Sequence, residues 1–595
     1  MIYDREDKYT FGKLAALNFK IAPQYAIVLL FQNIIEGLLP AWLTLAISSF
    51  IDSFQSGSES GAFFKALSIV VCIMILQNAA SSFFSFVRQR LKTALQRISE
   101  YEGMERAASL EYIYIEEREK SENVSRVTGG AANHIFSSYQ VILTTVSLAI
   151  RAGSLAVIFF QYHVWWVGII VLLFSMPVFV LSYRSGEKVY QFYKDNYSHS
   201  LQMNHQTYIL KNREMVNERT LFEYSHEIGE KWGRFRNEYF RKQLSTHLNA
   251  EKALKISSIG SCVMLGVLIA SMAAAYFQGA ITIGLLMAMV GSLVDLNSCI
   301  HQALAPMASN VSDIKGFILD LNRFLEYSFD PEYLSAPVKS EVIFESLEFE
   351  DVVFCYPNSD RKVLDHISFR IEGGRSYAFV GKNGSGKSTM IKLILGLYHN
   401  YGGRILLNGK DIKEYSKAER KSIFGVMFQD YAKYQISLKE NIDLGTVHDR
   451  EGISRRREEA LKKMKLHDLI ERLPKGLDTQ LGRLDASAQD ISGGEWQRIA
   501  IARLLVSEKQ VHIMDEPTSS IDPLLEECIF DWFSNPAGKT AASVVISHRL
   551  GVTKNVDKIY VMDQGKIVEQ GTYQELMDNG NMFYEMYTKQ QGRFV

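Results

Sequence analysis

The chain has 595 residues, a formal net charge of −1 and a hydrophobic fraction of 47%. Charge so close to neutral argues against nucleic acid as a partner, because such partners attract strongly basic chains. Five scattered cysteines (Cys72, Cys262, Cys299, Cys355 and Cys528) have no C-x-x-C spacing, which argues against a disulfide framework or a zinc site.

Six apolar stretches in the first half are each long enough to cross a lipid bilayer, which takes about 20 residues. We place these spans at about 24–50, 62–87, 137–161, 164–184, 256–278 and 281–305. Lys and Arg gather in the N-terminal segment and in the connections 88–130 and 184–255, whereas the short connections between spans have none. By the positive-inside rule, both termini and both long connections are cytoplasmic. This asymmetry disfavours the alternative of buried core helices in a soluble protein.

The two long connections are charged and keep helical periodicity, and connections of that length without structure are uncommon in compact proteins. We therefore expect spans two to five to continue as helices into the cytoplasm. Each helical pair must turn at its far end, and we place these turns near Leu110–Glu119 and Asn217–Tyr224.

Ionisable side chains inside the spans are candidates for function, because charge is costly in a bilayer. Glu36 lies in span one, Arg151 in span three, and Asp295 and His301 in span six. Glu36, Arg151 and Asp295 are candidates for a substrate cavity. The alternative is a structural pair of Arg151 with Glu36 or with Asp295.

A polar, proline-containing linker is expected at 326–345, which divides a membrane domain at 1–325 from a second domain at 346–595. The second domain begins with the alternating segment Leu347–Tyr356, typical of a strand. Tyr356 at its end either stacks on a nucleobase or packs on the edge of the sheet.

Residues 381–389 read GKNGSGKST and match G-x-x-x-x-G-K-[ST], the loop that wraps nucleotide phosphates with its backbone N–H groups. The strand-like Ser376–Val380 precedes the loop, and helical spacing follows at Met390–Leu395, so a helix N-terminus faces the phosphates. The candidate nucleotide ligands are Gly381, Asn383, Gly384, Ser385, Gly386, Lys387, Ser388 and Thr389.

Two carboxylates, Asp515 and Glu516, end the apolar segment Val511–Glu516, which is typical of a buried parallel strand. Parallel strands deliver residues to the carboxyl edge of a sheet, beside the phosphate loop. Asp515 is therefore a candidate ligand of Mg²⁺ together with Ser388. Glu516 is the candidate general base that activates the attacking water.

Ser492, Gly493 and Gly494 lead directly into a helical pattern that begins at Glu495. They form a second helix N-terminus able to bind phosphate. Since one nucleotide needs only one such cradle per chain, the second surface indicates that another copy of the chain completes the site.

In chain order, Tyr356, GKNGSGKST, Gln429, ISGGE, VHIMDE, Ser520–Asp522 and His548 resemble the nucleotide-binding domain of ABC transporters. With six spans before it, the whole chain resembles an exporter-type half-transporter of that family. The implied fold is multidomain: an all-α six-helix transmembrane domain with long cytoplasmic helix extensions, then an α/β P-loop ABC ATPase domain.

The resemblance implies ATP and Mg²⁺ as ligands and a dimer of half-transporters. It assigns Gln429 to Mg²⁺ sensing and contact with the membrane domain, and His548 to the γ-phosphate. It also places Ser492 and Gly494 on the partner's nucleotide and Asp522 in the loop between subunits. The two cytoplasmic turns fall where the family has its coupling helices.

Two departures from the family pattern stand out: ISGGE replaces LSGGQ, and Thr479–Asp485 lacks the usual Val-Gly-Glu-x-Gly pattern, so its part in domain coupling is left open. Glu516 and His548 are both present, which favours a homodimer with two equivalent sites over a heterodimer with one degenerate site.

The resemblance implies a multi-pass protein of a bacterial cytoplasmic membrane that exports its substrate by alternating access. Half-transporters that export modified peptides, including lantibiotics, look similar. The segment of about 20 residues before span one is too short for a leader-peptidase domain. A multidrug or lipid exporter, or flippase, is the main alternative, and a siderophore-type importer a lesser one. Outside transport, an ATP-gated signalling module stays open, whereas the spans argue against a soluble mechanical ATPase.

Overall fold

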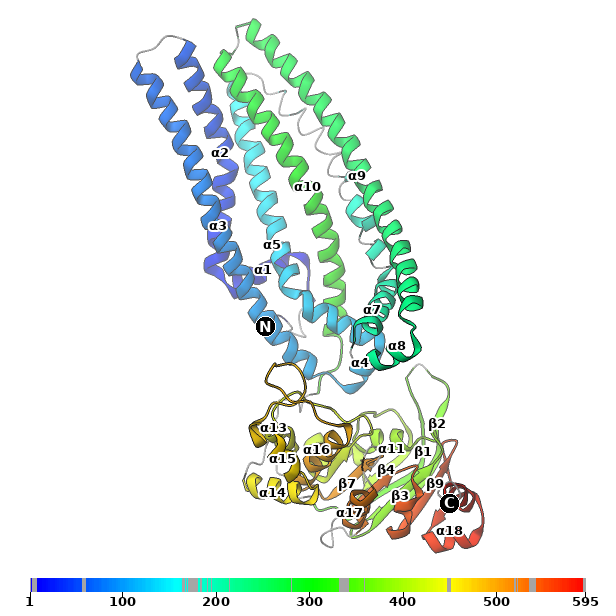
Figure 1. Cartoon of the computed structure of the whole chain (residues 1–595). Helices are drawn as coiled ribbons and strands as arrows, with labels where there is room; N and C mark the ends of the chain where they lie inside the picture. The colour runs from blue at the N-terminus through cyan, green and yellow to red at the C-terminus, as the bar shows by residue number, and fades with distance from the viewer. Residues whose placement is uncertain are drawn as a thin grey trace. The chain divides into compact units, whose positions relative to one another are not determined.

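The computed structural model forms two compact units, drawn in Figure 1. The first comprises Met1–Leu110 and Tyr114–Phe329, and the second comprises Glu111–Ile113 and Asp330–Val595. The division after Phe329 falls inside the linker expected at 326–345. The residues that the structure describes are 2, 8–55, 60–162, 166, 169, 180–181, 184–189, 191–193, 195–212, 215–279, 281–330, 342–357, 359–446, 451–517, 521, 523–534 and 542–591.

Long helices build the first unit (Figure 1). Its central helix α2 packs against α3, α5 and α10, and α9 packs against α7 and α10. The helices are α1 (Phe11–Ile21), α2 (Pro23–Gln55), α3 (Ser60–Ala108), α4 (Tyr112–Glu116), α5 (Arg118–Gln161), α7 (Tyr197–Lys211), α8 (Val216–Phe222), α9 (Ser225–Phe277) and α10 (Ile283–Leu325).

Several of these helices are much longer than a bilayer is thick. The 49 residues of α3 make a rod of roughly 70 Å, against a hydrocarbon core of about 30 Å. The expected extensions of spans two, three and five are therefore present, as α3, α5 and α9. Short helices stand at both expected turns: α4 follows a break at Ser109–Glu111, and α8 ends at Glu223, whose φ is +52°.

Among the described residues, three helices are long and apolar enough to cross a membrane: Pro23–Gln55, Phe63–Ala108 and Arg118–Gln161. Two shorter apolar helices, Cys262–Phe277 and Ile283–Cys299, coincide with the fifth and sixth expected spans. Most of the expected span at 164–184 lies outside the described residues. The count of six spans stays a prediction.

The second unit contains two sheets. A four-stranded antiparallel sheet has the order β2-β1-β4-β5, formed by β1 (Ser346–Cys355), β2 (Lys362–Glu372), β4 (Gly402–Leu407) and β5 (Lys410–Asp411). A six-stranded sheet has the order β10-β9-β3-β8-β7-β6, formed by β3 (Ser376–Gly381), β6 (Phe424–Met427), β7 (Val511–Asp515), β8 (Ala542–Ile546), β9 (Lys558–Asp563) and β10 (Lys566–Gly571).

Helices accompany these strands along the chain of the second unit. They are α11 (Lys387–Ile394), α12 (Lys417–Ile423), α13 (Leu438–Asp443), α14 (Ile453–Lys463), α15 (His467–Arg472), α16 (Gly493–Val506), α17 (Pro523–Ser534), α18 (Tyr573–Asn579) and α19 (Met582–Gln591). The phosphate-loop helix α11 starts at Lys387, three residues before the helical spacing that the sequence suggested, because Gly386 serves as its N-cap.

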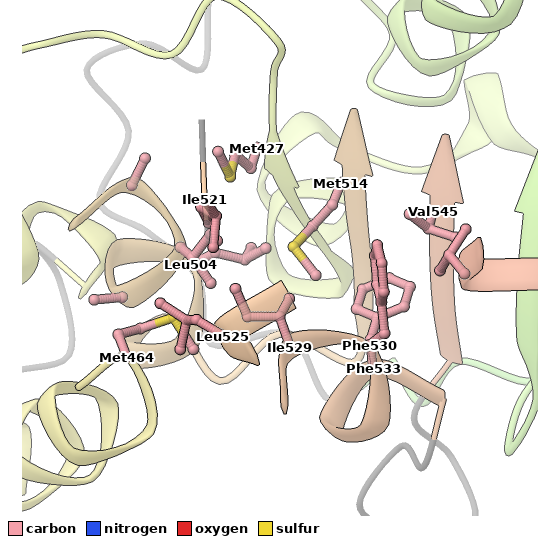
Figure 2. Packing of buried hydrophobic residues seen from close by; sticks show 14 of the residues in the cluster. Met427, Met464, Leu504, Met514, Ile521, Leu525, Ile529, Phe530, Phe533 and Val545 are labelled. Carbon is pink, nitrogen blue, oxygen red and sulfur yellow. The ribbon is translucent and has the colours of Figure 1, made fainter. Parts of the chain in front are cut away.

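Alternation along the central strands gives the six-stranded sheet a separate core on each face. On β7, Met514 joins one core while Ile513 joins the other, as the strand period of two requires. Figure 2 shows Met514 and Val545, from neighbouring strands, lying near Ile529, Phe530 and Phe533 of α17. Both faces of the sheet are therefore covered, which fixes the strand ends that carry the site.

Candidate functional site

Four neighbouring parallel strands, β3, β8, β7 and β6, end at one edge of the six-stranded sheet. The phosphate loop follows β3, Gln429 follows β6, Glu516 follows β7 and His548 follows β8. Ligands of open α/β sheets bind at this carboxyl edge. The topology therefore gathers residues that lie far apart in the sequence.

Backbone geometry makes glycine necessary at two places in the phosphate loop. Gly381 has a φ of +154°, and a Cβ built there would lie 2.1 Å from the carbonyl oxygen of Met562. Gly386 has a φ of +102°, and its Cβ would lie 2.7 Å from Leu364. A side chain at either position would push the loop away from the sheet.

Lys387 lies within the loop, 7% exposed. Its ammonium donates to the carbonyl oxygens of Gly381 and Lys382, each at 2.9 Å, and to the Ser385 hydroxyl at 3.4 Å. Burial lowers the pKa of Lys387, while the nearby Asp515 and Glu516 carboxylates raise it in part. A buried cation whose acceptors here are neutral oxygens favours the binding of an anion such as phosphate.

Ser388 and Asp515 form the candidate magnesium site. The Ser388 hydroxyl donates to Asp515 Oδ2 at 2.6 Å, and Asp515 is buried. Burial raises the pKa of Asp515, although the bond from Ser388 lowers it in part. Hydroxyl and carboxylate oxygens suit Mg²⁺, which is bound by few protein ligands with phosphate and water. Among the described residues, no group of three or more His, Cys, Asp or Glu could hold a metal ion.

Glu516 is the centre of a second cluster. Its carboxylate accepts from Gln429 Nε2 at 2.9 Å and lies 3.1 Å from His548 Nδ1. The Glu516 side chain is 13% exposed and that of His548 49%, so the histidine is accessible to a ligand. Three predicted site residues are thus brought together. Gln429, a predicted magnesium ligand, contacts the candidate base here.

Tyr356 lies over the start of α11. Its hydroxyl is 2.9 Å from Thr389 Oγ1, and the edges of Phe354 and Tyr398 pack on its ring. Tyr356 is half-buried. The two expected roles, stacking on a base and packing at the sheet edge, are therefore compatible, and the first stays a prediction.

The Ser492–Gly494 turn begins a different helix, α16. The Ser492 hydroxyl caps the helix by accepting from the Glu495 backbone N–H at 3.3 Å, and Glu495 accepts from the Ser492 backbone N–H at 2.8 Å. Glu495 also forms a close ion pair with Arg472 of α15. Ser492 and Gly493 are exposed, so this turn is accessible to a ligand.

A family model described as ABC transporter matches residues 364–519, which hold the phosphate loop, Gln429, the Ser492–Gly494 turn and Glu516. Subtilin transport ATP-binding protein SpaT of Bacillus subtilis is 28% identical over 571 residues, covering 93% of this chain and 90% of that protein. The chain thus carries an ABC transporter domain and resembles a transport protein over nearly its whole length. Its helical part, fused to one ATPase domain, makes it a half-transporter of the exporter type.

Two further proteins match almost the whole transporter. Nisin transport ATP-binding protein NisT of Lactococcus lactis subsp. lactis is 26% identical over 592 residues, covering 97% of this chain and 95% of that protein. The solved structure of a bacterial Atm1-family ABC exporter with ATP bound is 23% identical, with a TM-score of 0.74, covering 96% and 98%. The latter shows a shared fold. The ABC transporter domain and the matches to SpaT and NisT indicate that the transporter couples ATP hydrolysis to transport across a membrane.

A piece of the first expected cytoplasmic turn groups with the ATPase unit of the transporter. Within that unit, the Tyr112 ring meets the Tyr398 ring edge-on at 5.8 Å. Lys392 of α11 has its ammonium 5.5 Å from the Tyr112 ring and 5.5 Å from the Tyr356 ring. Tyr112 therefore contacts Tyr398, which in turn contacts Tyr356 of the candidate nucleotide site.

The predicted cavity residues lie on three helices of the transporter's first unit. Arg151 of α5 forms a close ion pair with Asp295 of α10 and donates to Cys299 Sγ at 2.7 Å. Glu36 of α2 accepts instead from Gln32 at 2.7 Å. Of the two alternative pairs, the structure therefore forms Arg151–Asp295. Asp522 and the His301 side chain lie outside the described residues.

Three contacts of the transporter's ATP site escaped the motif analysis. The Tyr431 hydroxyl donates to the Gly493 carbonyl at 3.1 Å, Gln497 Nε2 donates to the Glu516 carbonyl at 3.3 Å, and Arg472 pairs with Glu495. Tyr431 stands only two residues after Gln429, a hint that was available. Nothing in the spacing of Arg472 and Glu495 indicates their contact.

Proposed function

We propose that the transporter exports a peptide across a bacterial cytoplasmic membrane as a homodimer. The observation that supports this proposal most strongly is the similarity to SpaT and NisT, which extends over both the helical part and the ATPase domain. The names of these relatives state transport of subtilin and of nisin. A match that includes the helices supports a shared substrate class more directly than one confined to the ATPase domain would.

ATP hydrolysis in this proposal uses the cluster around Glu516. The carboxylate takes a proton from the attacking water, and Gln429 and His548 hold the carboxylate. Gln429 would also help to hold Mg²⁺, and His548 would contact the γ-phosphate. Lys387 turns from its loop carbonyls to the phosphates. Ser388 and Asp515 hold Mg²⁺, which when bound neutralises charge on the phosphate oxygens.

Each ATP is shared by two chains. Ser492 and Gly494 of one chain contact the γ-phosphate held by the phosphate loop of the other, and Asp522 lies in the loop between them. This assignment is supported by the exposure of Ser492 and Gly493, whose turn begins a helix other than that of the phosphate loop. The complete set of Glu516 and His548 supports two equivalent sites.

Alternating access follows from the preference of ATP for the closed dimer, because a ligand shifts an equilibrium only through its different affinity for the two states. Closure of the ATPase domains opens the substrate cavity outward, and hydrolysis resets it. Within the ATPase unit, the contacts of Tyr112 with Tyr398 and Lys392 tie this piece of the first cytoplasmic turn to the neighbourhood of the nucleotide site.

The membrane orientation follows the positive-inside rule, with both termini and the ATPase domain in the cytoplasm. Within the spans, Arg151 and Asp295 neutralise each other. Glu36 lies on the same face of α2 as the buried Leu29 and Gln32, away from the exposed apolar residues Phe31 and Ile35. Glu36 itself is exposed, and we take it as the group that contacts substrate.

The decisive experiment is transport into inside-out vesicles that carry the full-length transporter. With ATP, a labelled modified peptide of the subtilin or nisin type should accumulate inside the vesicles. Vesicles with Glu516→Gln, which cannot hydrolyse ATP, should show only background accumulation. Parallel arms use a fluorescent lipid analogue and a lipophilic cationic dye.

Each arm of this experiment has a distinct meaning. Accumulation of the lipid or dye without the peptide would contradict the peptide proposal and favour a lipid or multidrug exporter. ATP-driven release of a compound loaded into the vesicles would indicate an importer. No ATP-dependent movement of any compound, with ATPase activity intact, would favour a gated signalling module.

A further inference from the structure

The loop that carries His548 forms hydrogen bonds to residues outside the loop. The loop leaves β8 at Ile546 and enters a short 3₁₀ helix at Leu550. Within it, the Ser547 N–H donates to the Phe379 carbonyl at 3.2 Å and the Arg549 N–H donates to the Ser547 hydroxyl at 2.9 Å. Neither bond involves the carbonyl of His548.

Gln590 of the C-terminal helix α19 completes the loop. Its amide Nε2 donates to the His548 carbonyl oxygen at 3.0 Å, and its Oε1 accepts from the Leu550 N–H at 2.7 Å. One side-chain amide thus binds a carbonyl and an N–H two residues apart, on either side of the Arg549 backbone. This pair of bonds restrains the backbone from which the His548 ring extends.

The helix that carries Gln590 is firmly seated. Phe583 and Tyr587 are buried in the core beside the six-stranded sheet, where the buried Leu550 also lies. Residues four and seven positions after Phe583 share its helix face, so the same face carries Tyr587 and Gln590. The amide is therefore presented to the loop from a fixed support.

We propose that Gln590 is a positioning residue for ATP hydrolysis, which keeps His548 within reach of Glu516 and of the γ-phosphate. The inference rests on the role proposed for His548. It makes the C-terminal helix part of the ATPase machinery, although Gln590 lies 42 residues after the histidine and in no nucleotide-binding motif. Small displacements of a catalytic group are enough to slow a reaction strongly.

The test measures kcat and KM for ATP with the purified full-length transporter. Gln590→Ala should lower kcat by roughly 10-fold and leave KM for ATP nearly unchanged, since positioning acts on the chemical step. Gln591→Ala is the matched control. Gln591 donates instead to the Tyr587 hydroxyl at 3.1 Å, so this variant should keep the wild-type kcat.

A second background separates positioning from general damage to the fold. In a transporter that already carries His548→Ala, adding Gln590→Ala should cause no further loss of kcat, because residues that act as a unit are not additive. An equal loss in both backgrounds would overturn the proposal. If His548→Ala itself retains the wild-type kcat, the role of His548 fails and the inference fails with it.

Gln590→Glu is a second variant, which keeps the proposal testable if Gln590→Ala fails to fold. The carboxylate has nearly the same shape and can accept from the Leu550 N–H, but it cannot donate to the His548 carbonyl. It should lower kcat while the thermal unfolding midpoint stays at the wild-type value. A wild-type kcat in Gln590→Glu and Gln590→Ala, with a slow His548→Ala, would overturn the proposal and leave the role of His548 standing.

Discussion

Glu516 has a left-handed backbone conformation, with a φ of +51°, that residues other than glycine rarely adopt. Such strain costs on the order of 1–3 kcal/mol and persists only where neighbouring groups enforce it. Here the Glu516 N–H donates to the Ile546 carbonyl at 2.9 Å, and Gln497 donates to the Glu516 carbonyl at 3.3 Å. These bonds aim the carboxylate at Gln429 and His548.

The first prediction concerns the chemistry at this residue. Glu516→Gln keeps the shape of the side chain and removes the base, so ATP hydrolysis should fall by about 100-fold to 10,000-fold. Binding of ATP should persist. Glu527→Gln, a change at an exposed acid on α17, is the control. Measured ATPase activity close to wild type in Glu516→Gln would rule out the assigned base.

At the scale of single residues, the sequence motifs predicted six residues that the structure places together at one edge of the sheet. They are Lys387, Ser388, Asp515, Gln429, Glu516 and His548. Such residues are found by sequence because their loops impose particular backbone shapes or follow a recognisable strand. Tyr431, Gln497 and Gln590 act through backbone groups of distant residues. No short pattern records such contacts.

The N-terminus of α16 shows how one substitution alters an element. Gln is usual at the position of Glu495, and either residue can complete a capping box with Ser492. The carboxylate adds the ion pair with Arg472. Burial raises the pKa of Glu495, but its bonds from Ser492 and Arg472 together outweigh this, so its pKa lies below the usual value.

The second prediction follows from the sign of this shift. A depressed pKa in the folded state means that Glu495 stabilises the protein above the ordinary glutamate pKa, and that this stability is lost as the pH falls through the folded value. Glu495→Gln should therefore lower stability by about 1 kcal/mol near neutral pH, a modest value because Arg472 is exposed. The deficit should shrink on acidification.

Thermal unfolding of both proteins over a pH series measures this difference. A deficit that stays constant from neutral to acidic pH would show that the charge of Glu495 contributes nothing. Glu458→Gln is a useful control, because this exposed acid pairs with the exposed His467.

Gly37 lies at a close approach of α2 and α5. A Cβ at Gly37 would lie 2.9 Å from Ile150 Cβ and 2.9 Å from the Ser147 carbonyl oxygen, closer than real atoms allow. Small residues permit this kind of approach between membrane helices. The contact lies one residue from Glu36, so the helix crossing also sets the position of a candidate substrate group.

The third prediction is that Gly37→Ala destabilises the transporter by about 1–3 kcal/mol through overpacking. Gly153→Ala on α5 is matched to it, since nothing lies within 4 Å of a Cβ there. That control should be neutral or slightly stabilising. Thermal unfolding in detergent compares the two, and equal midpoints would contradict the close helix crossing.

At the scale of the whole molecule, the proposed sharing of each ATP site between two chains predicts complementation between two inactive variants. Lys387→Ala removes a phosphate ligand, and Ser492→Asp keeps a helix N-cap while its carboxylate repels phosphate. Each variant alone should have little ATPase activity. In a mixed dimer, the second chain's intact phosphate loop meets the first chain's intact Ser492, which restores one site.

Co-expression with two different affinity tags isolates the mixed dimer for ATPase assays. Roughly half of the wild-type activity is the upper expectation, because one of two sites is intact. A site built within one chain would give no recovery, since every chain carries a defect. The control is a dimer of two Lys387→Ala chains that carry the two different tags, which should have little ATPase activity.

The sequence by itself determined the order of a helical part and an α/β ATPase domain, and the identity of the ATP-site motifs. These features depend on local composition and on backbone shapes that short segments impose. Only the tertiary structure decided that Arg151 pairs with Asp295, that Tyr431 reaches Gly493 and that Gln590 holds the His548 loop. Such contacts depend on strand order and helix packing, which bring together residues whose spacing along the chain carries no periodic signal.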